Sequence, residues 1–284
     1  MTASHTRVLL ATEHTEQDEG AEAVALALAR HGAAPLSAVL PVSFNAEFEA
    51  LAPELAARAD AQAHARLQAL SADAARSGVA LEVVVRRGED PAFEIVAEAR
   101  ERRAELLVTR RRGRKGLIAN LLVGEMVSRV LAHAPCSVLV CPREARLWQR
   151  GVLLGIDPQA PSSALVQQAA AMAAAGGLPL HVCSVAPNEA ARSAALRALE
   201  AALAQARAVC PLAAGALRVG RPHQELITAA SEAGADLLVI GRHGRSVLGR
   251  AWIGGTAQKV IGLAPCPVLV HVEPGLVHVA PESA

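Results

Sequence analysis

The sequence predicts an α/β protein of two tandem domains, each a parallel β-sheet with helices on both faces. Short apolar runs alternate with alanine-rich helical stretches through most of the 284-residue chain. This alternation is typical of parallel sheets with right-handed helical crossovers. The same series of elements then occurs a second time in the same order, which indicates a duplicated domain. Two domains also suit the length of the chain.

Each element of domain 1 has a local sequence signal. Strands are expected over the short apolar runs and helices over the alanine-rich stretches, several of which end at a glycine. Pro91 opens a helix after Gly88-Glu-Asp, because proline is tolerated in the first helical turn and acidic residues favour the positive end of a helix. The expected strands are residues 7–11, 36–40, 79–85, 105–109 and 137–141, and the expected helices are residues 21–30, 51–77, 91–103 and 124–133.

The repeat is defined by runs that match in both sequence and order. Leu153-Leu-Gly-Ile-Asp157 lies 144 residues after Leu9-Leu-Ala-Thr-Glu13 (157 − 13 = 144), and Asp236-Leu-Leu-Val lies 131 residues after Glu105-Leu-Leu-Val (236 − 105 = 131). The second copy is therefore shorter. The difference falls mainly between its second and third strands, where loops and helix ends tolerate changes of length.

Composition limits the classes of function. Aromatic residues make up only 2% of the chain and the net charge is +1, so base stacking and attraction to phosphate backbones are weak and nucleic-acid binding is not expected. The N-terminus has no apolar segment of signal-peptide length, and no run of about 18 apolar residues occurs, which predicts a cytoplasmic protein without a membrane segment. Five cysteines form no CxxC pair, which favours buried reduced thiols.

One stretch of domain 2 suits phosphate binding. The pattern Gly241-x2-Gly244-x9-Gly254 follows an apolar run and precedes a short helix that starts near Gly255. Glycine lets a backbone turn tightly or approach a ligand closely. The unpaired N–H groups at the start of the helix then face the loop, and the positive end of the helix dipole favours an anion there.

This pattern, followed by Ala264-Pro-Cys-Pro-Val-Leu-Val270, resembles the nucleotide-binding loop and last strand of the universal stress protein family. The resemblance covers nearly the whole chain twice, and the chain is identified as a tandem member. The resemblance implies two Rossmann-like (adenine nucleotide alpha hydrolase-like) domains, each a five-stranded parallel sheet of order 3-2-1-4-5. In such sheets the ligand binds beyond the carboxyl ends of the strands, where the strand order reverses.

The two copies are expected to pack together. We place their boundary in the polar segment 142–150, so that domain 1 covers residues 1–145 and domain 2 covers residues 146–284. The last strand of each domain, at residues 138–141 and 268–271, is left at a sheet edge that needs cover or pairing. We therefore expect an intramolecular pseudo-dimer about a pseudo-twofold axis, and a further homodimer stays open.

The resemblance implies that domain 2 binds ATP, or the related AMP or ADP, with or without Mg²⁺. Asp157 matches the family's acidic residue near the phosphates or their metal ion. Val182 is expected at the end of strand two, where family members hold the adenine through backbone contacts. One departure is that the Ser or Thr usual after the third glycine is displaced by one position. The loop supplies the remaining candidates, Gly241, Arg242, His243, Gly244, Gly254, Gly255 and Thr256.

The corresponding loop of domain 1 departs from the pattern. Arg110 replaces the first glycine, Glu13 stands in place of the aspartate, and Glu125 follows Gly124 where the last helix begins. A carboxylate at a helix N-terminus already satisfies the dipole, and it repels phosphate. The run Arg110-Arg-Arg-Gly-Arg-Lys115 suits a solvated face, a phosphate clamp or pairing with acidic groups of the other domain, and these three readings stay open.

Other interpretations of the same residues also stay open. Asp157 suits a simple hydrogen bond to the turn at Pro158, and the glycine loop suits a surface loop without a ligand. The chain is then a nucleotide-free scaffold acting through protein partners or, against its charge balance, a nucleic-acid binder using residues 110–115. No general base or arginine finger is indicated, so catalysis is not expected beyond slow ATP hydrolysis. The histidines lack the helical spacing of zinc ligands.

Overall fold

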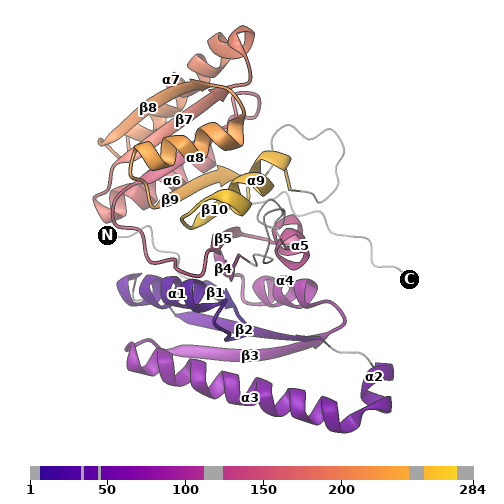
Figure 1. Cartoon of the computed structure of the whole chain (residues 1–284). Coiled ribbons are helices and arrows are strands. Elements are labelled where there is room, and N and C mark those ends of the chain that lie inside the picture. Colours follow the sequence, from indigo (N-terminus) through magenta and orange to yellow (C-terminus); the bar gives the residue numbers. More distant parts are fainter. Residues whose placement is uncertain (1–6, 33–34, 44–45, 112–123, 243–252, 274–284) are drawn as a thin grey trace.

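The computed structural model describes residues 7–32, 35–43, 46–111, 124–242 and 253–273, and it confirms the tandem α/β architecture (Figure 1). Domain 1 contains strands β1 to β5 and domain 2 contains strands β6 to β10. The strands are β1 (Val8–Ala11), β2 (Leu36–Ser43), β3 (Leu81–Gly88), β4 (Leu106–Arg110), β5 (Ser137–Cys141), β6 (Val152–Ile156), β7 (Leu180–Ala186), β8 (Ala213–Val219), β9 (Leu237–Gly241) and β10 (Val268–His271). The helices are α1 (Glu19–Gly32), α2 (Ala46–Leu51), α3 (Pro53–Arg76), α4 (Pro91–Glu101), α5 (Glu125–His133), α6 (Ser163–Gly176), α7 (Arg192–Arg207), α8 (Pro222–Glu232) and α9 (Gly255–Leu263).

The strand order within each domain is the expected one. Domain 1 runs β3-β2-β1-β4-β5 and domain 2 runs β8-β7-β6-β9-β10, with parallel pairing throughout each domain. The order therefore reverses between β1 and β4 and again between β6 and β9. These two points are the topological switch points, at which α/β sheets bind their ligands.

The two sheets join into one ten-stranded sheet instead of remaining separate. β10 pairs antiparallel with β5, placing Leu269 opposite Leu139 and Val268 opposite Val140. All four side chains are buried. The last strands of the two domains, expected to lie at sheet edges, thus cover each other, because pairing satisfies backbone groups that an open edge leaves unpaired.

Helices cover both faces of the sheet, as alternation along each strand requires. Leu10 points to the face covered by α1, α3, α6 and α7, while its neighbour Leu9 points to the face covered by α4, α5, α8 and α9. Successive strand residues point to opposite faces, so strands buried on both sides are apolar throughout. Each fully buried leucine contributes about 1.5–3 kcal/mol through the water it excludes.

The long helix expected over residues 51–77 is in fact two helices. α3 begins at Pro53, and the residue before it, Ala52, has a non-helical φ of −138°. Proline disfavours helical geometry in the preceding residue but is tolerated in the first turn of a new helix. Neither α3 nor any other helix in the described part of the chain combines the length and apolar composition that crossing a membrane requires.

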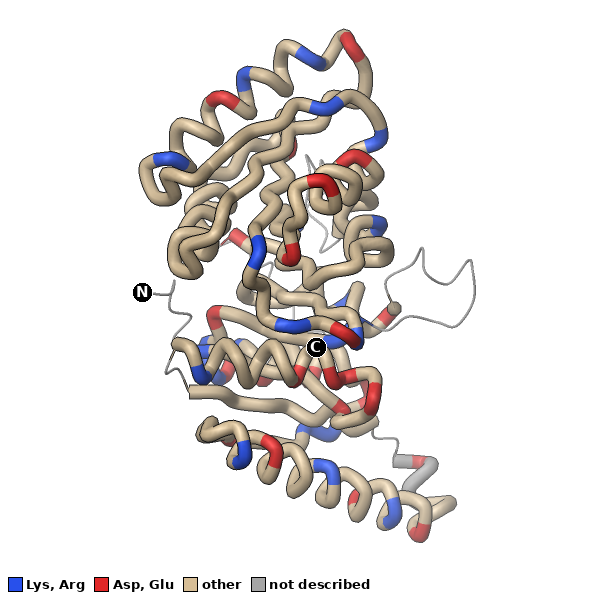
Figure 2. Tube along the Cα trace, turned by 60° about the vertical axis from the view of Figure 1, so that its left-hand side comes forward, with Lys and Arg blue, Asp and Glu red and all other residues tan. Residues whose placement is uncertain are grey.

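Charged side chains of both signs are interspersed over both domains (Figure 2). Several form ion pairs that recur in the repeat, such as Arg86 with Glu98 at 2.6 Å in domain 1 and Arg218 with Glu225 at 3.1 Å in domain 2. Arg86 and Arg218 are counterparts at the ends of β3 and β8. Solvent-screened pairs of this kind contribute about 0–1 kcal/mol each, so the apolar core rather than surface charge holds the sheet.

Candidate functional site

A cleft of about 690 Å³ opens at the carboxyl ends of the strands of domain 2. It lies at the switch point between β6 and β9, and its size falls within the roughly 300–1,000 Å³ of small-molecule sites. The cleft is lined by residues 155–162, Leu165, Val185, Pro187, Pro222, Leu226, residues 240–242, residues 254–257, His271 and Glu273.

Asp157 directly follows β6 and lines this cleft. Its Oδ1 accepts a hydrogen bond of 2.8 Å from the Gln159 backbone N–H, and its carbonyl accepts one of 3.2 Å from Ala160. The turn-stabilising interpretation of Asp157 is therefore correct, but it accounts for only one carboxylate oxygen. The same side chain remains available at the cleft for a cation or a polar ligand group.

The start of α9 forms the opposite wall. The Gly254 N–H donates to the Arg242 carbonyl at 3.1 Å, which closes the neck of the glycine loop. Gly254 caps α9 without a side-chain hydrogen bond, and a Cβ at Gly255 would meet no atom within 4 Å. Thr256 follows, exposed, so backbone N–H groups and one hydroxyl border the cleft. The candidates His243 and Gly244 lie outside the described residues.

Val182 is not at the end of strand two, which corrects the expectation. β7 continues to Ala186, and Val182 is fully buried within it, opposite Leu154 of β6. The cleft is reached instead by Val185 and Pro187. The apolar run from Leu180 continues unbroken to the proline, which is a signal that marks the true end of the strand.

Two further contributors to the cleft were missed in the sequence. Ser162 caps α6, where its Oγ accepts a hydrogen bond of 3.2 Å from the Leu165 N–H. A serine before an apolar helical run is a typical cap signal. Leu226 of α8 closes on β6 because a Cβ at Gly155 would lie 2.8 Å from its Cδ2. That close approach has no signal beyond a glycine within a strand.

Arg242 lines the cleft, but its side chain is committed elsewhere, which corrects the expectation of a nucleotide contact from it. The guanidinium Nη1 lies 3.3 Å from the Ala132 carbonyl and 3.4 Å from the Ala134 carbonyl, at the end of α5 in domain 1. Arg242 is only 8% exposed. Burial lowers its pKa, and the cation instead complements the negative end of the α5 dipole.

Arg111 makes the same contact in the opposite direction. It stands 131 residues before Arg242 (242 − 111 = 131), and its Nη1 donates to the carbonyls of Ile261, at 3.1 Å, and Ala264 at the end of α9. The two domains therefore exchange arginines, each capping the last helix of the other. Of the residues in the basic run, Arg111 contacts domain 2 through carbonyls rather than acidic groups, and residues 112–115 lie outside the described ranges.

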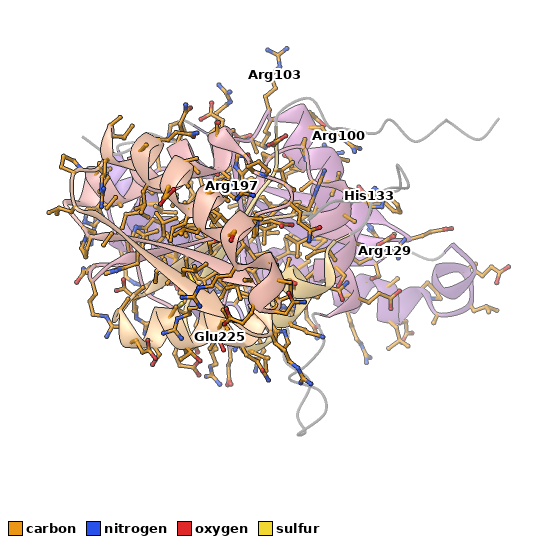
Figure 3. The ribbon with its side chains drawn as sticks, turned by 90° about the horizontal axis from the view of Figure 1, so that it is seen from above. Arg100, Arg103, Arg129, His133, Arg197 and Glu225 are labelled. Atoms are coloured by element: carbon orange, nitrogen blue, oxygen red, sulfur yellow. The ribbon has the colours of Figure 1, made fainter. Side chains whose placement is uncertain are left out.

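Removing either arginine should weaken the junction between the domains. We expect Arg111→Ala and Arg242→Ala each to lower the free energy of unfolding by about 1.5–3 kcal/mol, the range for hydrogen bonds made by a charged group. Lysine should restore only part of the loss because it lacks the planar fork of donors. Thermal unfolding measures the effect. Arg197→Ala on the exposed side of α7 (Figure 3) is the control, and equal melting temperatures would contradict the contact.

His271 ends β10 beneath the cleft and is 8% exposed. Its Nδ1 contacts the Gln168 amide oxygen, so this nitrogen carries the proton, while the buried Nε2 has no hydrogen-bond partner in the described structure. Burial lowers the pKa of His271, with Glu273 opposing the shift. The folded state therefore favours neutral imidazole, because a second proton would have no acceptor.

Stability should consequently fall in mild acid. The pKa of His271 is lower in the folded chain than its unfolded value near 6.5, so the unfolded chain binds the proton first. The contribution is complete above about pH 6.5 and is lost as the pH falls, by at most about 1.4 kcal/mol per pH unit. Urea unfolding from pH 7.5 to 5.5 should show a steeper decline for the unmodified chain than for His271→Gln. Parallel pH profiles would contradict this assignment.

The five cysteines are free and buried. Burial raises the pKa of Cys183 and Cys266 to about 11 and that of Cys136 to about 12, so these thiols are protonated and unreactive at neutral pH. Within the described ranges, no three His, Cys, Asp or Glu side chains are arranged to hold a metal ion by themselves.

The cleft, the switch point and the doubled strand order agree with a comparison of the sequence with family profiles. Residues 5–142 and residues 150–271 each match the profile of the universal stress protein family. The chain belongs to this family. It is a tandem universal stress protein, with one family domain on either side of the segment between β5 and β6.

Individual relatives support this assignment. A universal stress protein of Thermus aquaticus is 43% identical over 51 residues, and another of Synechocystis is 25% identical over 165 residues. These matches cover 18% and 58% of this chain, and the chain spans only 37% and 57% of the two relatives. A solved universal stress protein of Archaeoglobus fulgidus shares the fold over 95% of this chain and 99% of its own, with a TM-score of 0.73 and 20% identity.

Proposed function

We propose that domain 2 binds an adenine nucleotide, ATP or the related AMP or ADP, and uses it in a signalling or stress-protective role. The observation that carries the proposal is the start of α9, where Gly254, Gly255 and Thr256 border the cleft at the switch point. Backbone N–H groups and the helix dipole favour phosphate there, and no side chain at Gly255 obstructs it. The apolar wall that includes Val185 and Leu226 suits the base.

Local charge supports an anionic ligand. Arg221 and Lys259 lie beside His223, whose pKa is lowered first by burial and then by these two cations. Neither cation has an acidic partner among the described residues. In domain 1 the two counterpart positions hold an ion pair, Asp90 with Arg129 (Figure 3). Domain 2 therefore keeps a positive potential near the starts of α8 and α9, which attracts phosphate.

A divalent cation fits beside Asp157. Mg²⁺ in proteins is held by one or two carboxylates together with phosphate oxygens and water. Asp157 offers one carboxylate oxygen that no described residue engages. The cation supplies charge neutralisation between this carboxylate and the phosphates. The protein's own contribution is to hold the Asp157 side chain in its turn through the Gln159 N–H.

The proposal is tested by ligand analysis and titration. Mass spectrometry of ligand released from freshly purified chain should detect an adenine nucleotide, and calorimetry should show ATP binding. Asp157→Asn keeps the hydrogen bond to the turn but removes the charge, so it should lose about tenfold in affinity with Mg²⁺ and little without it. Equal losses in both conditions would remove the cation from the proposal. Absence of any nucleotide binding would favour a scaffold that acts through protein partners.

A further inference from the structure

We propose that Arg110 occupies in domain 1 the place that the nucleotide takes in domain 2, and that it limits the chain to one bound nucleotide. Arg110 is then a specificity-determining residue, a permanent cation that belongs to the chain itself. The proposal rests on the proposed function of domain 2. It concerns how many nucleotides the chain accepts and where.

Arg110 is held by a buried set of polar groups. It is 4% exposed. Its Nη2 lies 2.8 Å from a Glu13 carboxylate oxygen, and its Nη1 lies 2.8 Å from an Asp18 carboxylate oxygen and 3.0 Å from the Thr15 hydroxyl. The guanidinium therefore points from the end of β4 across to the end of β1 and the start of α1, which is the switch point of domain 1.

The same positions form the cleft in domain 2. Arg110 corresponds to Gly241, since each is the last residue of its strand and Arg110 pairs with Cys141 as Gly241 pairs with His271. Gly241 lines the cleft, and so do the counterparts of all three partners of Arg110. At an offset of 144 residues, Glu13 corresponds to Asp157, Thr15 to Gln159 and Asp18 to Ser162.

Charge at this point disfavours a nucleotide. Two carboxylates surround one guanidinium, and the second oxygen of Asp18, whose residue is 1% exposed, has no hydrogen-bond partner within the described structure. Glu125 adds a further carboxylate in the first turn of α5. Phosphate approaching this end of domain 1 would meet uncompensated negative charge, while the arginine already neutralises the acidic groups to which a cation would bind.

A purely structural ion pair is the simpler interpretation. Buried ion pairs are weak indicators of stability, because desolvation offsets most of their attraction. A structural role alone, however, does not require Arg110 and its three partners to fall on four positions that line the cleft of the other domain. This coincidence favours replacement of a ligand.

The test transfers the residues of domain 2 into domain 1. The graft combines Glu13→Asp, Asp18→Ser, Arg110→Gly and Glu125→Gly, and its matched control carries the other three changes but keeps Arg110. Titration with Mg²⁺-ATP and native mass spectrometry should give one nucleotide for the unmodified chain and for the control, and two for the graft. In a chain whose domain 2 is blocked by Gly255→Glu, the graft should bind one nucleotide and the ungrafted chain none.

Three results would overturn the proposal. They are two nucleotides bound to the unmodified chain, a second nucleotide bound to the control, and a graft that unfolds cooperatively but gains no site. If the unmodified chain binds none while the graft binds one, the proposed function of domain 2 fails and the role of Arg110 stands. Should the graft not fold, photolabelling of the unmodified chain with azido-ATP decides: label confined to domain 2 peptides supports the proposal, and label at the end of β4 overturns it.

Discussion

Gly255→Glu is expected to abolish ATP binding, with a loss of affinity of at least about 100-fold, while the fold stays intact. The substitution introduces into domain 2 the residue that domain 1 carries at the same position, Glu125 in the first turn of α5. A Cβ at Gly255 would meet no atom within 4 Å, so the side chain fits. The new carboxylate satisfies the positive end of α9 and replaces attraction for phosphate with repulsion.

Stability separates this result from simple damage. Glycine is a poor helix former, and a carboxylate in the first turn is favourable, so the variant should gain about 0.5–1 kcal/mol in unfolding free energy. Titration calorimetry and thermal unfolding measure the two effects. Gly255→Gln, of the same shape without charge, is the matched control and should keep most of the affinity. Equal losses for the two variants would show that bulk, rather than charge, excludes the nucleotide.

Arg110→Met is expected to destabilise domain 1 strongly. The substitution leaves Asp18 buried without its cation, and removal of one partner of a buried ion pair typically costs about 3–5 kcal/mol. Asp18 is 1% exposed and one of its oxygens already lacks a partner, so the carboxylate has little access to water. With about 2–4 °C per kcal/mol for a chain of this size, the melting temperature should fall by roughly 6–20 °C.

A second substitution identifies the cause. Arg110→Met combined with Asp18→Ser removes the stranded charge and introduces the residue found at the counterpart position, Ser162, so it should recover most of the lost stability. Asp18→Ser alone should cost less than Arg110→Met, because the exposed side of Glu13 still neutralises the arginine. Thermal unfolding of the three variants measures these differences. A double variant as unstable as Arg110→Met would point to lost packing instead of an unpaired charge.

Local pattern predicted most of the fold. Alternating apolar runs and alanine-rich stretches placed the helices and strands within a few residues, because strands buried on both faces must be apolar throughout. The strand order followed from the family resemblance. What the pattern left undetermined was how the last strands would be covered. The antiparallel pairing of β10 with β5 depends on two segments more than a hundred residues apart (268 − 141 = 127).

The site was predictable where it depends on backbone and not where it depends on tertiary direction. Gly254, Gly255 and Asp157 border the cleft because their place follows from the ends of β6 and the start of α9. Arg242 was misjudged because its side chain turns toward a helix of the other domain. Arg110 looked like the loss of a glycine, and its acidic partners emerged only when α1 folded back onto β4.

The antiparallel junction between β5 and β10 also bears on how the chain is made. β5 is complete at Cys141, whereas β10 begins only at Val268, 127 residues later (268 − 141 = 127). At about 5–20 residues per second, a ribosome needs roughly 6–25 s to synthesise that interval. Throughout it the nascent first domain presents an unpaired apolar edge, which is a template for any other strand. The speed of synthesis thus decides whether β5 meets its own β10 or that of a neighbouring chain.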